Sequence, residues 1–284
     1  MSSQLIAIVT DSSAYIPAAV CAGLDITVIP LWLIWDDQNL RDGVDIQPEE
    51  FYRRLVQSSS LPTTAQPTVK EFVHLFKQLA GRAQAIVAVL TSSKISGTVA
   101  SAEGAMAELP EIPIRVVDSL SSSMGMGLAV LAAARAASEG KSLDEVVRAA
   151  ESMRDKAQLL FVVDTLEYLH KGGRISGGKR LLGTALQIKP LLQFKDGLIQ
   201  PLAQARTMRK AIDKLLTIVE ERLAGSKMVA AAIVDIENPE GGAAVQAMIE
   251  ERFKPSTVYR AGVSPVVGTH VGPGALGIAF YGDG

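Results

Sequence analysis

The chain has 284 residues, of which 48% are hydrophobic and only 5% are aromatic, and its formal net charge is −2. Because this length exceeds that of a usual single domain, we expect two compact units with substantial cores built from small aliphatic side chains. The nearly balanced charge gives no basic stripe for a phosphate backbone, so a nucleic-acid partner is not expected.

Nothing in the sequence indicates export or membrane insertion. The first twenty residues contain no Lys or Arg, and the longest apolar helical stretch, 127–137, is interrupted by Arg135. This stretch is far shorter than the roughly 20 residues that span a bilayer. The single Cys21 cannot form an intrachain disulfide. We therefore expect a cytoplasmic protein without stable membrane insertion.

The first half alternates apolar runs with amphipathic stretches, as expected for a parallel sheet flanked by helices. Two capping-box spacings, Thr68 with Glu71 and Ser142 with Glu145, mark helix starts. The expected strands are 5–9, 26–31, 85–90 and 114–117, and the expected helices are 48–56, 69–79, 124–138 and one from 143. We assign residues 1–156 to an N-terminal α/β domain.

After residue 156 the strand-like runs crowd together. The pair Asp196-Gly197 lies between two of these runs and predicts a hairpin, so part of this sheet should be antiparallel. The expected strands are 159–163, 188–194, 198–205, 228–234, 257–263 and 276–281, with helices at 208–223 and 242–252. We assign residues 157–284 to a second α/β domain with a mixed sheet, which makes the whole chain a two-domain α/β protein.

The segment 91–98 follows a buried strand and opens a helix, and it is rich in hydroxyls. Free amides at a helix N-terminus and short hydroxyl side chains together favour a small anion. A capping role for Ser96 is an equally acceptable interpretation of this segment.

Five other polar segments are candidates for the same site. The loop 62–67 presents Thr64, the loop 9–13 presents Ser12, and the Gly-rich loop 268–274 holds His270. Arg174 follows a glycine pair, and Arg206 closes a strand. Turn formation, capping or surface charge is the alternative interpretation of these segments. None of the three histidines has a partner at metal-ligand spacing, so no metal site and no cofactor are expected.

In their residue sequences and their order along the chain, these segments resemble the motifs of the DegV family of bacterial fatty-acid-binding proteins. Two departures are visible, Ala65 where the family usually has Ser and Ile95 where it usually has Leu. The matching segments are 9–12, 28–31, 42–46, 64–67, 92–98, 117–119, 123–125, 168–174 and 269–274. The resemblance implies two α/β domains, the second akin to a domain of dihydroxyacetone kinases, with a fatty acid between them.

The resemblance also implies roles for individual residues. Thr64 and Ser96 would hold the carboxylate of a C16–C18 fatty acid, with Ser93 as an alternative to Ser96. Arg174 would contact a separate ATP-binding fatty acid kinase, or the transferred phosphate, during acyl-phosphate formation for phospholipid synthesis. The other implied residues are His270, Arg206 and Thr269 at the head group, and Ser12, Gly97, Ser123 and Gly125 in the cleft.

Two alternatives assign catalysis to this chain. The first is a serine esterase or hydrolase acting on a lipid-like substrate, although no Gly-x-Ser-x-Gly motif occurs. Its candidate residues are Ser96 or Ser93, His270, and Asp11 or Asp118. The second is a nucleotide-dependent kinase, although the chain has no Gly-x-x-x-x-Gly-Lys-Ser/Thr phosphate loop. We therefore expect a non-catalytic carrier.

Overall fold

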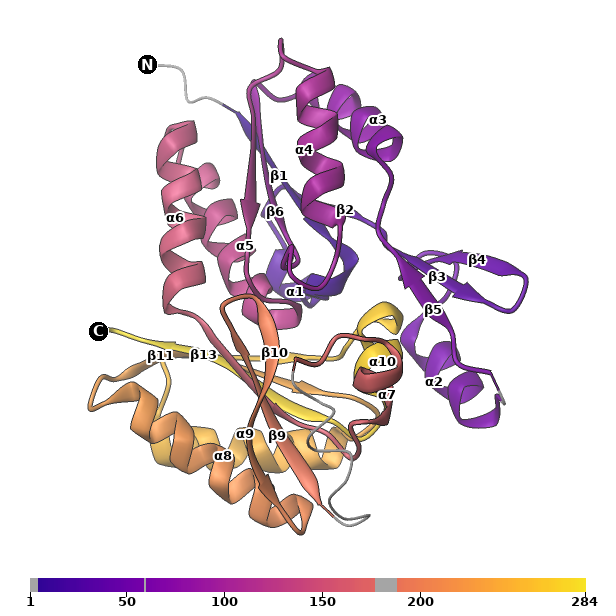
Figure 1. Cartoon of the computed structure of the whole chain (residues 1–284). Helices are drawn as coiled ribbons and strands as arrows, with labels where there is room; N and C mark the ends of the chain where they lie inside the picture. The colour runs from indigo at the N-terminus through magenta and orange to yellow at the C-terminus, as the bar shows by residue number, and fades with distance from the viewer. Residues whose placement is uncertain (1–4, 59, 177–187) are drawn as a thin grey trace.

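A computed structural model describes residues 5–58, 60–176 and 188–284. The N-terminal part forms a parallel sheet in the order β2-β1-β6-β7. Helices cover both of its faces (Figure 1). The strands are β1 (Ile6–Asp11), β2 (Ile26–Ile29), β6 (Ala85–Leu90) and β7 (Ile114–Asp118), and the helices are α3 (Val69–Ala80), α4 (Thr98–Glu108), α5 (Ser123–Ser138) and α6 (Leu143–Lys156).

The central strands of this sheet are buried on both faces. Every residue of β1 and β6 is buried, because α3 and α4 pack against one face while α5 and α6 pack against the other. Unbroken apolar runs of this kind are typical of parallel sheets. The predicted parallel sheet and the capping boxes of α3 and α6 are confirmed.

The C-terminal part forms a mixed sheet of six strands in the order β10-β9-β8-β13-β11-β12, in which only β11 and β12 are parallel neighbours. Asp196 and Gly197 both have positive φ in the turn between β9 and β10, as the sequence predicts. The elements are β8 (Gln158–Val162), β9 (Lys189–Lys195), β10 (Leu198–Ala205), α8 (Met208–Leu223), β11 (Met228–Asp235), α9 (Pro239–Phe253), β12 (Thr257–Ala261) and β13 (Leu276–Gly282). The α/β fold class is confirmed, whereas the domain boundary at residue 156 stays a prediction.

The two faces of the six-stranded sheet pack against different parts of the molecule. Side chains alternate between faces along a strand. On β8, Leu160 and Val162 point into the core formed with α8 and α9, whereas Leu159 and Phe161 belong to a second core shared with α5 and the N-terminal half. This second face lies toward the parallel sheet.

A small lobe was not expected from the sequence. It holds a three-stranded antiparallel sheet and α2 (Pro48–Gln57), and it projects to one side in Figure 1. Its strands are β3 (Trp32–Trp35), β4 (Gln38–Arg41) and β5 (Thr63–Ala65). Residues 62–67 were expected to form a loop, but β5 pairs with β3 through Thr63, Thr64 and Ala65.

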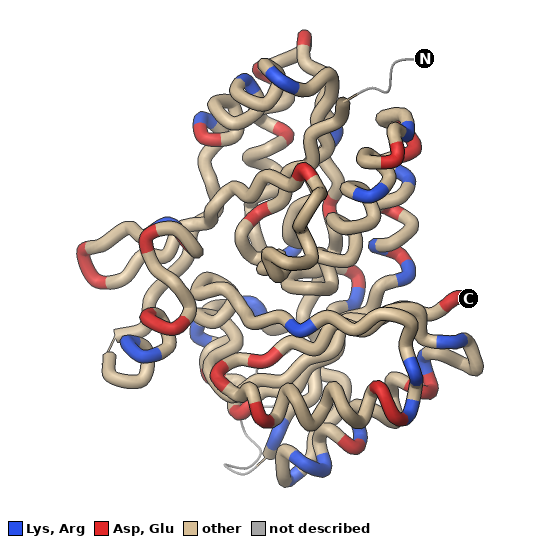
Figure 2. Tube along the Cα trace, turned by 180° about the vertical axis from the view of Figure 1, so that it is seen from behind, with Lys and Arg blue, Asp and Glu red and all other residues tan. Residues whose placement is uncertain are grey.

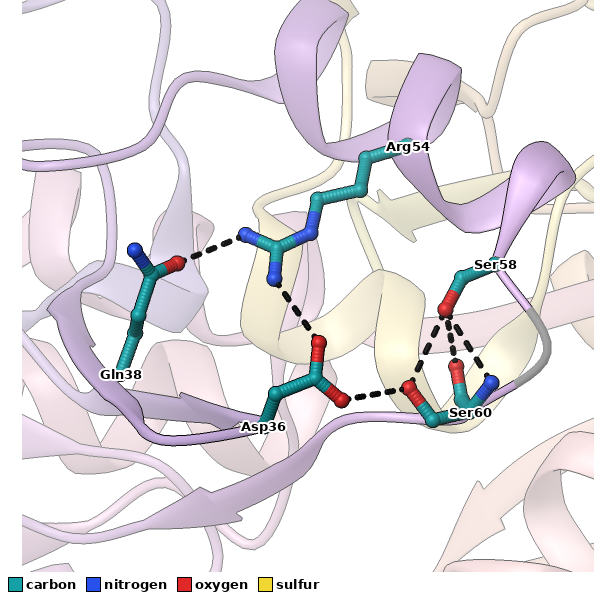
Figure 3. A network of polar contacts seen from close by, with 5 residues as sticks. All are labelled: Asp36, Gln38, Arg54, Ser58 and Ser60. Atoms are coloured by element: carbon teal, nitrogen blue, oxygen red, sulfur yellow. Dashed lines mark hydrogen bonds and ion pairs between the residues drawn. The ribbon is translucent and has the colours of Figure 1, made fainter.

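A polar network fixes α2 to the hairpin of this lobe (Figure 3). Arg54 donates to Gln38 over 3.0 Å and to Asp36 over 3.2 Å, and its guanidinium stacks 4.2 Å from the centre of the Trp35 ring. Asp36 also accepts a 2.8 Å bond from Ser60, which lies on the segment leading to β5. The network therefore helps to hold β5 against the hairpin.

The described residues also form four short helices: η1 (Ser12–Ala14), α1 (Ala18–Cys21), α7 (Glu167–Lys171) and α10 (Pro265–Val271). The prediction of a loop around His270 is wrong, because His270 lies in the last turn of α10. Ser264 caps this helix and Pro265 occupies its first turn, so it begins with a common start signal. Gly272, with φ 78°, ends the helix.

Basic and acidic residues are interspersed along the trace in Figure 2, in agreement with the small net charge. Within the described ranges, no helix combines the length and apolar character needed to cross a membrane.

Candidate functional site

A cavity with about 920 Å³ of unoccupied space, including its open mouth, lies between the parallel sheet and the six-stranded sheet. Its wall combines residues from both halves of the chain and from the small lobe. The cavity therefore exists only when these parts pack together.

Most of the cavity wall is apolar, and the six-stranded sheet supplies part of it. Leu159 and Phe161 on β8 reach the cavity because they point away from α8. Phe194 and Ile199 come from the β9–β10 hairpin, and Val234 comes from β11. No charged side chain interrupts this set, so the wall suits a hydrocarbon.

The polar end of the cavity brings together residues that are far apart in the sequence. The Thr64 hydroxyl oxygen lies 2.8 Å from Nε2 of His270, 206 residues away. Ser96 and Arg174 line the same cavity. β5 positions Thr64, α10 positions His270, the β6–α4 loop positions Ser96, and the segment after α7 positions Arg174.

His270 is held in a neutral state at this end. Burial, together with the nearby positive charge of Arg174, lowers the pKa of His270 to about 4. Its Nδ1 atom is buried without a hydrogen-bond partner among the described residues. A methyl group on Gly172 would collide with this atom, so glycine at position 172 allows the close approach.

Helix α10 is anchored by a buried carboxylate. Asp42 accepts a 2.6 Å bond from the Ser12 hydroxyl and a 3.3 Å bond from the backbone N–H of Val266. Burial raises the pKa of Asp42 to about 6, against the opposing effect of these bonds. Asp42 thereby connects the end of β1, through Ser12, to the helix that carries His270.

Ser96 makes a local contact with Thr98 and also lines the cavity. Its Oγ lies 2.8 Å from the Thr98 hydroxyl and accepts a loose 3.4 Å bond from the Thr98 N–H. The neighbouring Gly97 gives room for the side chain of Gln66, because a methyl group at Gly97 would lie 2.8 Å from Nε2 of Gln66. The N-cap of α4 is Gly97 and has no side-chain cap bond, so the alternative capping role of Ser96 is not observed.

Arg174 joins two parts of the cavity mouth. Its Nη1 donates to the carbonyl of Gly172 over 2.6 Å, and its Nε donates to the carbonyl of Ile95 over 3.2 Å. The guanidinium is thus held beside His270, in the wall of the cavity.

The structure does not bring all of the expected head-group residues to the cavity. Ser93 is exposed outside the cavity wall, and its backbone N–H donates to Asp118. Arg206 is also exposed, seven residues along the chain from the wall residue Ile199, or roughly 20 Å along an extended strand. Thr269 is buried and donates to the carbonyl of Pro265 one helical turn earlier.

Of the four expected cleft residues, one lines the cavity and three do not. Ser123 lines the cavity, whereas Ser12, Gly97 and Gly125 are absent from its wall. Ser12 is engaged by Asp42 and by the Leu31 N–H. Gly125 lets α5 approach β8, because a methyl group there would lie 3.0 Å from Leu159.

The geometry does not form the triad of a serine hydrolase. Nε2 of His270 contacts Thr64 rather than Ser96 or Ser93, and no described carboxylate accepts a bond from Nδ1. Asp11 instead accepts bonds from Ser13 and Thr91.

In the described ranges no group of three or more His, Cys, Asp or Glu side chains is placed to hold a metal ion.

Sequence reasoning missed several residues of the wall. Gln66, Ser13, Thr91 and Ser122 all line the cavity. Gln66 lies in the same motif as Thr64, and Ser13, Thr91 and Ser122 follow the ends of strands in the parallel sheet, where ligands of such sheets gather. These four residues could therefore have been identified from the sequence. The apolar wall had no such signal, because its residues look like ordinary core.

Comparison with known proteins assigns the family. The sequence model described as "Uncharacterised protein, DegV family" matches residues 5–283. The chain belongs to the DegV family. A DegV domain-containing protein of Streptomyces coelicolor is 37% identical over 278 residues, which cover 97% of this chain and 98% of the relative.

Two solved DegV structures share the architecture. The fatty-acid-binding DegV family protein from Thermus thermophilus matches with a TM-score of 0.92 and 32% identity, covering 98% of this chain and 99% of that one. The fatty-acid-binding DegV protein of Bacillus subtilis matches with a TM-score of 0.89 and 32% identity, covering 99% of this chain and 100% of that one.

Proposed function

We propose that this DegV protein binds one long-chain fatty acid of the C16–C18 class, with its tail along the apolar wall and its carboxylate beside Thr64 and Ser96. The observation that carries this proposal is an apolar cavity with hydroxyl groups and a neutral imidazole gathered at one end. The fatty-acid binding of the relatives from Thermus thermophilus and Bacillus subtilis supports it.

The tail supplies most of the binding free energy. At about 0.8 kcal/mol per methylene, burial of a chain of roughly sixteen carbons offers on the order of 10 kcal/mol of gross transfer free energy. Loss of ligand freedom and ordering of side chains consume part of this gain. The head group loses water and needs hydrogen bonds in exchange, so its contacts fix the position of the ligand more than its affinity.

His270 makes Thr64 a donor toward the carboxylate. We assign the ring proton to Nε2, because Nδ1 has no acceptor among the described residues. Nε2 then donates to the Thr64 oxygen, and the hydroxyl proton of Thr64 is directed to the ligand. Ala65 carries no hydroxyl, so Thr64 and Ser96 are the side-chain donors that we propose for the carboxylate.

We further propose that the bound carboxylate is phosphorylated by a separate ATP-binding kinase for use in phospholipid synthesis. A carboxylate oxygen would attack the γ-phosphate of ATP on the partner, and ADP would leave, giving an acyl phosphate. This chain would contribute positioning rather than a nucleophile. Arg174 lies in the cavity wall beside His270, where a guanidinium would meet the partner or the transferred phosphate.

Denaturing extraction of the purified protein, followed by mass spectrometry, tests the binding proposal. We expect one long-chain fatty acid per chain. The double variant Thr64→Val with Ser96→Ala should retain less lipid than the wild-type protein, because its carboxylate site lacks two hydroxyl donors. Thr63→Val should retain the wild-type amount, because Thr63 is exposed and points away from Thr64 on the same strand. Lipid-free protein that binds no added fatty acid would contradict the proposal.

The partner role needs a separate assay. Protein loaded with radiolabelled palmitate should yield no hydroxylamine-trapped acyl phosphate with ATP alone, and should yield it after addition of a cell extract that contains the kinase. Arg174→Ala should lower the yield without loss of bound palmitate. Acyl phosphate formed by the purified chain and ATP alone would refute the carrier role.

A further inference from the structure

A polar group of four further hydroxyl residues lines the cavity in addition to Thr64 and Ser96. The ends of β1, β6 and β7 in the parallel sheet lead into segments that contribute Ser13, Thr91, Ser122 and Ser123 to the wall. Ser123 is 7% exposed, and its Oγ has no hydrogen-bond partner among the residues that the structure describes. A buried hydroxyl in this state is unusual, because most buried polar atoms have a partner.

The neighbouring hydroxyl protons are already donated. Ser13 donates to Asp11 over 2.5 Å, and Ser122 donates to the Ser13 oxygen over 3.3 Å. Thr91 donates to the carbonyl of Ser121 over 3.3 Å. Each of these oxygens has lone pairs, so among the described hydroxyls of this part of the wall Ser123 is an uncommitted donor next to several acceptors.

This pattern distinguishes between possible ligand groups. A hydroxyl oxygen accepts one bond and donates another, so it can satisfy Ser123 and an acceptor such as Ser122 together. A second carboxylate would be repelled by these lone pairs and by the buried Asp11 nearby. A plain methylene group would leave Ser123 without a partner.

We propose that this polar group is a second subsite that recognises a hydroxyl on the acyl chain, and that the protein binds hydroxylated fatty acids. The inference rests on the proposed fatty-acid function and deepens it. Because the carboxylate is fixed at Thr64 and Ser96, the distance to Ser123 selects one position of hydroxylation along the chain. At other positions the hydroxyl would face the apolar wall and lose its hydrogen bonds to water without replacement.

Displacement of a fluorescent fatty acid by stearic acid and by a series of monohydroxystearic acids tests the proposal. With the wild-type protein, one positional isomer should bind about 10-fold more tightly than the other isomers, as expected when one hydroxyl is paired and the others are not. Ser123→Ala should reduce this preference to about 2-fold and change the binding of stearic acid by about 2-fold or less.

Two further variants complete the experiment. Ser123→Gly removes the same hydroxyl and suits the positive φ of 48° at this position, so it serves if Ser123→Ala does not fold. Ser138→Ala is the control, because Ser138 is an exposed residue at the far end of the same helix. It should preserve the preference for the isomer.

The outcomes separate this inference from the proposed function. The inference is wrong if stearic acid binds while every hydroxystearic acid isomer binds more weakly than stearic acid and with similar affinity. In that case the subsite binds at most a water molecule. The inference also fails if the preference persists in both Ser123 variants. If neither stearic acid nor any isomer binds, the proposed fatty-acid function fails as well.

Discussion

Asp42 bonds to the first turn of helix α10, and His270 lies in the last turn of the same helix. Both groups have a shifted pKa, but their effects on stability have opposite signs. The pKa of Asp42 is raised from 3.8 to about 6 in the folded protein. Below pH 6 the folded state therefore binds more protons at this group than the unfolded state does, and the free energy of unfolding falls as the pH rises from 4 to 6. The pKa of His270 is lowered from 6.5 to about 4, so its contribution to stability is lost as the pH falls from 6.5 to 4.

The two effects are similar in size. A shift of one pKa unit corresponds to about 1.36 kcal/mol, so between pH 4.5 and pH 7 each group changes the free energy of unfolding by about 2 kcal/mol. In the wild-type protein the two contributions offset each other. Replacement of one group should therefore expose the pH dependence of the other.

Asp42→Asn removes the carboxylate while the side-chain oxygen can still accept the bond from Val266. We expect its free energy of unfolding, relative to wild type, to be about 2 kcal/mol lower at pH 4.5 than at pH 7. His270→Gln should show the opposite trend, and the double variant should show neither. Urea unfolding of lipid-free protein at several pH values, followed by tryptophan fluorescence, measures these differences. Parallel curves for wild type and both single variants would refute the assignment of these pKa shifts.

Three other perturbations test the site and the small lobe. Gly172→Ala should displace the ring of His270 and weaken fatty-acid binding by roughly 10-fold with little change in stability, and equal binding would show that the ring position is unimportant. Val234→Trp should narrow the cavity, so the lipid extracted with the protein should have shorter chains, and an unchanged lipid profile would place the tail elsewhere. Arg54→Ala removes a partly exposed ion pair and the stacking on Trp35. The free energy of unfolding, measured in urea, should therefore fall by about 1 kcal/mol. A loss above about 3 kcal/mol would mean that the network supports more of the protein than the lobe.

The larger elements could be predicted from the sequence because their signals are local. β6 and β10 have the expected bounds, and α3 begins at the expected capping box. The small lobe was missed because β3 is only four residues long and β4 is polar, so neither has a clear apolar period.

Helix α10 shows how glycine can mislead. Gly268 and Gly272 suggested a loop, but Gly268 lies within the helix, where a side chain would collide with Tyr52 of α2. Ser264 and Pro265 were the start signal that could have revealed the helix.

The candidate site was only partly predictable. Thr64, Ser96, His270 and Arg174 were named from motifs, and the structure places all four in one cavity wall. The cavity itself could not be predicted, because its apolar wall depends on which face of β8 and β11 points away from α8 and α9. That choice is made by the packing of the two sheets, which no local pattern reports.

The contact between Thr64 and His270 spans 206 residues of chain and has a consequence for folding. Such contacts form late, because a long loop must first be closed, and proteins rich in them fold slowly. Neither half of the chain alone contains both partners, so a fragment cannot acquire the complete pocket. A lipid bound in the cavity would therefore stabilise the assembled protein by mass action, and the supply of lipid would influence how long each newly made copy survives.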